Sequence, residues 1–376
     1  MIQVSGRAML ASIFVLVAAA GCEKVEIPSL TESGSKAPNL PTAEPDSGKR
    51  PSPVAAKQPV PVRHGNAAAG QPCPTPTAEP GPSVRPSAAS VLASINAKPS
   101  LRVTDQDLRK FSGIDEGLET VTELKLTGAT LSAAGLEVLA TLPALKKLDL
   151  EHARIRDADW SGLAGATTLE SLNLKKSSIR NTTMSALSGM TNLKLLDISD
   201  TRVTDLGFKH LAKLSALEHL VVESLNIEGN GMQELGRKGA NAPLRTIHAS
   251  QTTFGRLGFI YLREFDDLEE LYVTAASVSN NSLSGLSRVT TLRRVSLAGN
   301  PLVTDAGLKF LRKSRQLEYL ELSGVWKISD ETLKGFSKHR NLKELRINDS
   351  LCTLDGVVAF KNSVPRCTVY LRGEKH

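Results

Sequence analysis

Cysteine and histidine are the residues of this chain that could bind a metal or act as nucleophiles, and they are few. The sequence has four cysteines and seven histidines: Cys22, Cys73, Cys352 and Cys367 are the cysteines. No two cysteines have the CxxC spacing of zinc or redox sites, and the chain has no HExxH, GxSxG, P-loop or GxGxxG motif. We therefore expect a protein that is not an enzyme and that uses no cofactor and no metal.

Cys22 ends an apolar amino-terminal stretch. In residues 1–21 one basic residue, Arg7, precedes an uncharged run from Ala8 to Gly21, which predicts a secretory signal peptide. The run is shorter than the about 20 apolar residues that a membrane-spanning helix needs. It ends in Ala-Ala-Gly followed by Cys22, and this sequence resembles the lipobox of bacterial lipoproteins.

The lipobox resemblance implies that residues 1–21 are removed and that Cys22 becomes a lipidated first residue. Ala19 departs from the family pattern, which favours leucine at that place. Glu23 stands where aspartate would favour retention in the inner membrane, so the resemblance implies a location in the bacterial cell envelope, at the outer membrane rather than the inner one, facing the periplasm or the outside. The alternative is an ordinary secretory signal in which Cys22 is incidental.

Residues 22–100 are rich in proline. Fifteen of the nineteen prolines lie between Pro28 and Pro99, and large apolar side chains are scarce there. Such a segment cannot bury enough surface to offset its conformational entropy. We predict a disordered linker, partly of polyproline II conformation, in which Cys73 is a free thiol or pairs between chains.

From residue 121 onward the pattern LxxLxL recurs ten times at intervals of 24 to 27 residues. The copies are VTELKL, LKKLDL, LESLNL, LKLLDI, LEHLVV, LRTIHA, LEELYV, LRRVSL, LEYLEL and LKELRI. In each copy the fourth and sixth residues point to one face of a strand, and a single strand cannot bury that leucine row, so the copies must stack. After the strand, Thr204, Thr304 and Ser329 are good N-cap residues, each followed by an acid, which predicts a short helix in each unit.

The repeats resemble the ribonuclease-inhibitor-like leucine-rich repeats, and GVWKISDETL and GNPLVTDAGL resemble the cysteine-containing subtype of F-box substrate receptors. The resemblance implies an α/β leucine-rich-repeat solenoid, a right-handed horseshoe with parallel strands on its concave face and helices on its convex face. We expect this domain over residues 101–376, with about ten repeats in 121–366 and a terminal capping strand in CTVYL. The fifth unit is three residues longer around Gly236–Pro243, which is either a binding loop or a tolerated insertion.

Two of the cysteines fall in the last unit. Cys352 and Cys367 occupy apolar positions of the repeat, so both could simply be small core residues. In an exported protein they could also form a disulfide across the terminal unit.

The third and fifth residues of each LxxLxL face the concave solvent side. They are charged at both ends of the solenoid, whereas an apolar and aromatic group occupies its middle: Leu195, His219, Val221, His248 and Tyr272. Because neighbouring strands lie about 4.8 Å apart, we expect these five residues to form one ligand-binding patch. His219 and His248 lack a clear third ligand, so we predict no metal there.

The charge of the chain does not indicate a nucleic-acid binder. Residues 101–376 contain 37 Lys and Arg against 33 Asp and Glu, with both signs interspersed. We therefore expect a protein-binding module, anchored to a membrane through Cys22, that binds no nucleic acid. The alternatives are the substrate-recognition subunit of an enzyme complex, as in F-box receptors, and a structural spacer of the envelope.

Overall fold

The computed structural model describes residues 86–99, 102–114, 116–236 and 242–376. The predicted signal peptide, Cys22, Cys73 and the linker as far as residue 85 lie outside the described residues, as does most of the longer loop of the fifth unit. All described residues belong to one compact unit, Ala78–His376.

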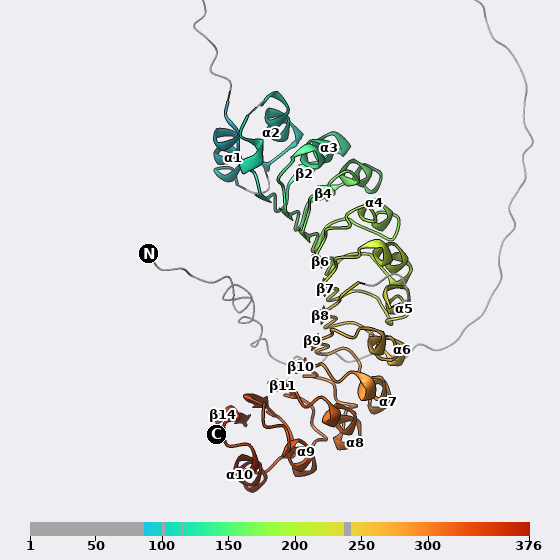
Figure 1. The fold of residues 1–376 in the computed structure, drawn as a ribbon, viewed down its shortest axis with the longest axis vertical. Coiled ribbons are helices and arrows are strands. Elements are labelled where there is room, and N and C mark those ends of the chain that lie inside the picture. The colour runs from blue at the N-terminus through green and yellow to red at the C-terminus, as the bar shows by residue number, and fades with distance from the viewer. Residues whose placement is uncertain (1–85, 100–101, 115, 237–241) are drawn as a thin grey trace, which may run out of the picture. The chain divides into compact units, whose positions relative to one another are not determined.

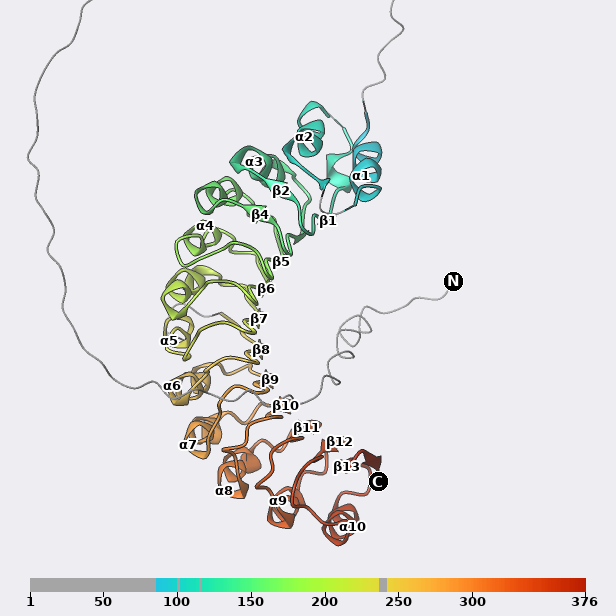
Figure 2. The ribbon, with the colours of Figure 1, turned by 180° about the vertical axis from the view of Figure 1, so that it is seen from behind.

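Within this unit, parallel strands line the inner side of a curved stack and helices line the outer side (Figure 1, Figure 2). Twelve strands form one sheet in the order of the chain, with β2 and β4 pairing separately. The main strands are β1 Glu123–Lys125, β3 Lys147–Asp149, β5 Ser171–Asn173, β6 Leu195–Asp197, β7 His219–Val221, β8 Thr246–His248, β9 Glu270–Tyr272, β10 Arg294–Ser296, β11 Tyr319–Glu321, β12 Glu344–Arg346, β13 Thr368–Leu371 and β14 Glu374–Lys375; the short pair is β2 Thr130–Leu131 and β4 Arg154–Ile155.

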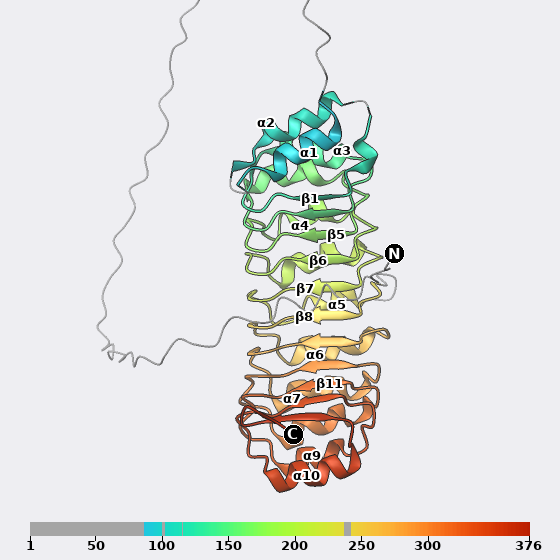
Figure 3. The same ribbon diagram turned by 90° about the vertical axis from the view of Figure 1, so that its left-hand side faces the viewer.

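The ten predicted strands are all present, stacked in register one above the next (Figure 3). Their fourth and sixth residues are buried: Leu196 and Ile198, for example, are both inaccessible to solvent. The strand β13 lies where CTVYL predicts it and pairs parallel with β12. The strand β14 then folds back antiparallel on β13, which the sequence pattern does not predict. The predicted solenoid fold is confirmed.

The outer layer contains α-helices and 3₁₀ helices. The α-helices are α1 Ala88–Asn96, α2 Asp105–Leu108, α3 Ala133–Thr141, α4 Met184–Leu187, α5 Met232–Leu235, α6 Arg256–Tyr261, α7 Asn280–Leu283, α8 Asp305–Leu308, α9 Asp330–Phe336 and α10 Leu354–Ser363. The 3₁₀ helices are η2 Arg109–Gly113, η3 Leu118–Thr120, η4 Asp157–Leu163, η5 Asp205–Lys213, η6 Leu262–Glu264, η7 Ser284–Arg288 and η8 Lys309–Lys313. A 3₁₀ helix rises about 2.0 Å per residue against 1.5 Å in an α-helix, so it crosses the outer layer with fewer residues.

Helix α1 corrects the predicted extent of the linker. It lies inside residues 22–100, yet Ala88, Val91 and Ile95 are buried on one of its faces. The hydroxyl of Ser87 accepts a hydrogen bond from the Ser90 N–H and starts the helix. The prediction of disorder up to residue 100 is therefore wrong for Ala88–Asn96, which packs against η2 and η3, ahead of the first repeat.

The acids at the helix starts join neighbouring repeats. The Asp305 carboxylate accepts hydrogen bonds from the N–H and the hydroxyl of Ser329 in the next unit, at 3.0 and 2.9 Å. The Asp330 carboxylate likewise accepts from the N–H and the hydroxyl of Thr353, at 2.9 and 2.7 Å. The predicted N-caps are present at Thr304 and Ser329, whose side chains accept from backbone N–H groups. The starts of α9 and α10 are thus each tied to the unit before them.

The eighth residue of each unit adopts a left-handed backbone conformation. Its φ is +66° at Gly299 and +72° at Gly324, but +49° at Ala275 and +55° at Asp200, where a side chain makes this conformation unfavourable. The conformation lets the N–H of the eighth residue reach the next unit: that of Gly299 donates to the Ser323 carbonyl at 2.8 Å. The strand exits are therefore hydrogen-bonded along the stack beyond the strands themselves.

Candidate functional site

The concave face carries two rows of side chains, from the third and the fifth residue of each repeat. Strand register sets Val221, His248 and Tyr272 directly beside one another in the fifth-residue row. Leu195 and His219 are neighbours in the third-residue row. The structure therefore brings the five predicted patch residues together on β6–β9, but each is half-buried rather than fully exposed. Their role in binding stays a prediction.

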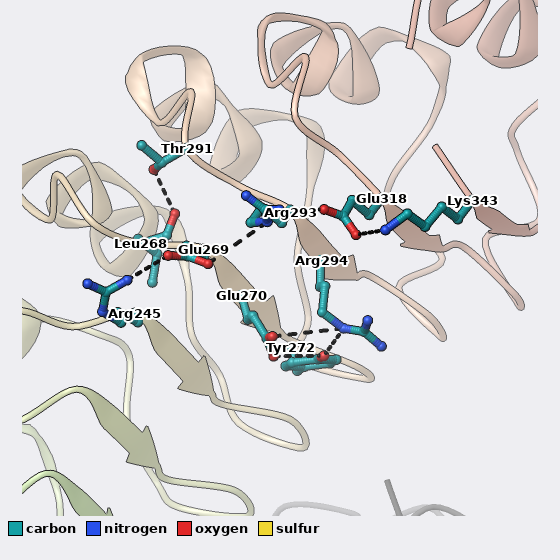
Figure 4. Close-up of polar contacts among 10 residues, drawn as sticks. All are labelled: Arg245, Leu268, Glu269, Glu270, Tyr272, Thr291, Arg293, Arg294, Glu318 and Lys343. Atoms are coloured by element: carbon teal, nitrogen blue, oxygen red, sulfur yellow. Dashed lines mark hydrogen bonds and ion pairs between the residues drawn. The ribbon is translucent and has the colours of Figure 1, made fainter. Parts of the chain in front are cut away.

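Tyr272 is held from two sides. Its ring stacks on His248, with 4.3 Å between ring centroids and 29° between planes. Its hydroxyl donates to Glu270 at 3.1 Å and accepts from Arg294 Nε at 3.1 Å (Figure 4). Burial raises the pKa of the Tyr272 phenol, so the hydroxyl is a neutral donor at pH 7.

The two histidines on this face do not face each other. His219 pairs with Thr246 across β7 and β8, whereas His248 lies opposite Val221. His248 Nδ1 is 3.7 Å from a Glu223 carboxylate oxygen. In the described part of the chain, no three His, Cys, Asp or Glu side chains form a group that could hold a metal ion.

The aromatic surface continues beyond the predicted patch, over β10–β13. Arg294 lies 5.0 Å from the ring centroid of Tyr319, and Arg346 lies 4.7 Å from that of Tyr370. Each pair joins directly opposite residues on adjacent strands. We define the arginine–tyrosine cluster as Tyr272, Arg294, Tyr319, Arg346 and Tyr370. The sequence signal was visible for Tyr272, Arg294, Tyr319 and Arg346, which stand at third or fifth positions of the repeat. Tyr370 lies in the capping strand and joins the row through its register with Arg346.

Carboxylates fix the arginine–tyrosine cluster in place. Arg346 Nε donates to Glu344 at 2.6 Å and lies 3.6 Å from Glu321. The Tyr319 hydroxyl donates to Glu321 at 3.1 Å, and burial raises its pKa. The charged residues at this end of the solenoid are therefore paired with each other and packed on aromatic rings.

An ion-pair ladder runs beside the cluster, along the second residue of the nine repeats after the first. The signs alternate without a break: Lys146, Glu170, Lys194, Glu218, Arg245, Glu269, Arg293, Glu318 and Lys343. Arg245 reaches Glu269 at 2.7 Å and Arg293 reaches Glu318 at 2.6 Å (Figure 4). Lys194 and Lys146 lower the pKa of Glu170 to about 2. The alternation leaves this row nearly neutral, so it stabilises the stack rather than attracting a charged ligand.

Of the two alternatives for Cys352 and Cys367, the structure shows core residues rather than a disulfide, since both are buried and free. All of α10 separates them, and a ten-residue helix spans about 15 Å, whereas disulfide-bonded Cα atoms lie within about 7 Å. Burial raises the pKa of Cys352 to about 11 and that of Cys367 to about 12, which keeps both thiols protonated and unreactive.

One edge of the solenoid becomes apolar in the last three units. Leu302, Trp326 and Leu351 follow strands β10, β11 and β12 and are 58%, 62% and 67% exposed. The residues at this edge in the earlier units are polar and exposed: Thr130, Arg154, Ser178, Arg202, Asn226, Thr253 and Ser277. This apolar edge is a second surface that the sequence pattern did not predict.

Among the described helices, none is long and apolar enough to cross a membrane.

Comparison with known proteins supports the fold. A leucine-rich-repeat sequence model matches residues 290–311. No curated protein matches the chain in sequence. The repeat match and the twelve-stranded stack together identify the folded part as a leucine-rich-repeat solenoid.

Several solved structures are similar to it. An internalin from Listeria monocytogenes has 17% identity and a TM-score of 0.49, covering 74% of this chain and 92% of that one. The Arabidopsis receptor kinase HAESA, solved with the peptide hormone IDA and the co-receptor SERK1, has 18% identity and a TM-score of 0.45, covering 64% of this chain and 40% of that one. A chain in an octameric complex of Latrophilin 3, Unc5D and FLRT2 has 18% identity and a TM-score of 0.47, covering 68% and 84%.

Proposed function

We propose that this chain is a non-enzymatic protein-binding module that presents the concave face of its repeats to a protein partner. The arginine–tyrosine cluster carries the proposal. Tyrosine and arginine are, with tryptophan, the residue types enriched at the energetic centres of protein interfaces. Here they are gathered on five adjacent strands, β9–β13, and three of the four tyrosines of the chain belong to the cluster.

The side chains of the cluster are already held in place in the unbound chain. Arg294 and Arg346 each lie over a tyrosine ring and beside a carboxylate. Side chains that are already ordered lose little conformational entropy on binding, so more of the contact energy appears as affinity. The predicted patch adjoins the cluster through Tyr272. From β6 to β13 the two together extend about 34 Å, at about 4.8 Å per strand.

Paired variants test this proposal. Arg294→Ala with Tyr319→Ala removes the centre of the cluster, and Leu206→Ser is the matched control because Leu206 is 74% exposed at the start of η5. Immobilised protein of each kind is used to capture partners from bacterial envelope extracts. We expect the cluster variant to lose capture of a defined protein that wild type and control retain. Equal capture by all three contradicts a role for this face.

We also propose that Cys22 anchors the chain to the outer membrane of a bacterial cell envelope. The support is sequence alone: the run Ala-Ala-Gly before Cys22, with Glu23 after it. Radiolabelled palmitate should enter the wild-type chain and not a Cys22→Ser variant. Labelling that persists without Cys22, or that is absent from both, contradicts the anchor.

A further inference from the structure

The net charge of the folded part is not spread evenly. Residues 309–376 contain 14 Lys and Arg against 8 Asp and Glu, whereas residues 101–308 contain 23 against 25. The positive excess therefore belongs to the last three units. It concentrates further in three acid-free connections, each counted with the helical residues that lead into it: 309–317 with η8, 337–343 after α9, and 361–367 with the end of α10.

These connections surround an open hollow of about 750 Å³. Arg315 follows η8, Ser337, Lys338 and Arg340 follow α9, and Asn362 and Ser363 end α10; together these six residues line it. Arg315, Lys338 and Arg340 are exposed at its wall. None of the three forms an ion pair with a carboxylate in the described part of the chain. By contrast, Arg293 and Lys343 nearby both pair with Glu318.

Helix ends do not account for this much positive charge. The carboxyl end of a helix carries about half a negative charge. The two α-helices that end at the hollow, α9 and α10, therefore offset about one cation. Three cations line the hollow, so about two positive charges remain without a counter-charge.

A buried histidine lies in the same positive potential. His339 lies between Lys338 and Arg340 in sequence and is inaccessible to solvent. Burial, together with the positive charges of Arg315 and Arg312, lowers its pKa to about 4. A neutral ring at this position adds no further repulsion between cations.

We propose that this hollow binds a phosphate group of a ligand. Arg315 and Arg340 supply planar guanidinium groups that can each hold two oxyanion oxygens, and Lys338 supplies a point charge. The Asn362 amide and the Ser363 hydroxyl add neutral donors. The phosphate belongs either to a soluble compound or to a lipid headgroup. This site lies on helix-to-strand connections, outside the arginine–tyrosine cluster, and does not depend on the function of that cluster.

The test uses the full chain with Cys22→Ser, so that no lipid anchor contributes to membrane binding. The first probe is pyrophosphate, measured by titration calorimetry. The second is sedimentation with phosphatidylcholine vesicles, with and without phosphatidylglycerol. The site variant is Arg315→Gln with Arg340→Gln. The matched control is Lys209→Gln with Lys213→Gln, which removes the same charge from exposed positions of η5.

We expect at least tenfold weaker binding in the site variant and unchanged binding in the control. Binding of pyrophosphate identifies a soluble ligand, and binding of the phosphatidylglycerol vesicles alone identifies a lipid headgroup; both support the site. Binding that is absent for both probes overturns the proposal, and so does equal weakening in the two double variants, because that result indicates general charge attraction.

Discussion

Asp305 of one repeat accepts two hydrogen bonds from Ser329 of the next, one from its N–H and one from its hydroxyl. The contact spans 24 residues of sequence but joins adjacent units of the stack. An acid in the first turn of a helix is expected to stabilise its own helix. Here the acid also satisfies the backbone N–H that begins the following helix, so it couples one repeat to the next.

Replacing Asp305 by Ala should lower the free energy of unfolding by about 1–3 kcal/mol, because the Ser329 N–H loses a charged acceptor. Asp355→Ala is the matched control: Asp355 is an exposed first-turn acid of α10, the last helix, which has no following repeat. Urea titration followed by circular dichroism measures both. An equal loss of unfolding free energy in the two variants would show that the acid stabilises only its own helix and does not couple the repeats.

Ala275→Gly should stabilise the protein by about 0.5 kcal/mol. The residue has φ +49°, a conformation that costs a side chain roughly 1–2 kcal/mol and glycine little, while the greater freedom of glycine in the unfolded chain takes back part of the gain. The neighbouring Ala276→Gly is the control, since it removes a buried methyl group at ordinary φ and should destabilise. The two changes should shift the thermal midpoint in opposite directions; a lower midpoint for Ala275→Gly refutes the argument.

His339 should make stability depend on pH between about 6.5 and 4. Its folded-state pKa of about 4 lies below the ordinary value of 6.5, so the unfolded chain binds the proton more readily. This contribution is fully present above pH 6.5 and is lost as pH falls towards 4; it amounts to about 3 kcal/mol. The slope of unfolding free energy against pH should be reduced over this range in His339→Phe. An unchanged slope would mean that other groups cause it.

Reduction should leave the thermal midpoint of the protein unchanged, because Cys352 and Cys367 are free thiols. Alkylation should reach both only after unfolding, since both are buried. The intact mass of the protein is measured before and after reduction. A gain of two mass units on reduction, which would indicate a bond between the two cysteines, would contradict this arrangement.

Sequence periodicity sufficed to predict the solenoid, because each strand is determined by its own leucines and by their spacing. Helix α1 was missed since proline dominates the surrounding composition, although Ala88, Val91 and Ile95 have helical spacing. The row positions of Arg294 and Tyr319 followed from the repeat. Their stacking did not follow, because it depends on side-chain conformations that a pattern does not specify.

The charge count of the chain did not predict the ladder or the basic hollow, for a related reason. Counted over residues 101–376, the two signs look evenly mixed. The repeat, however, places equivalent residues of successive units side by side. It therefore separates a neutral ladder at the second positions from a basic hollow at Arg315, Lys338 and Arg340. Charges counted by repeat position, rather than along the chain, would have shown both.

The most direct test of the protein-binding face is site-specific photo-crosslinking. A benzoylphenylalanine replaces Tyr272 or Tyr370, which are the two ends of the arginine–tyrosine cluster. The control carries it in place of the exposed Leu206. Intact cells that contain each variant are then irradiated. We predict the same discrete crosslinked protein from both cluster positions and no adduct of that protein from position 206. Adducts of equal yield at all three positions, or none at the cluster, would contradict the proposed binding face.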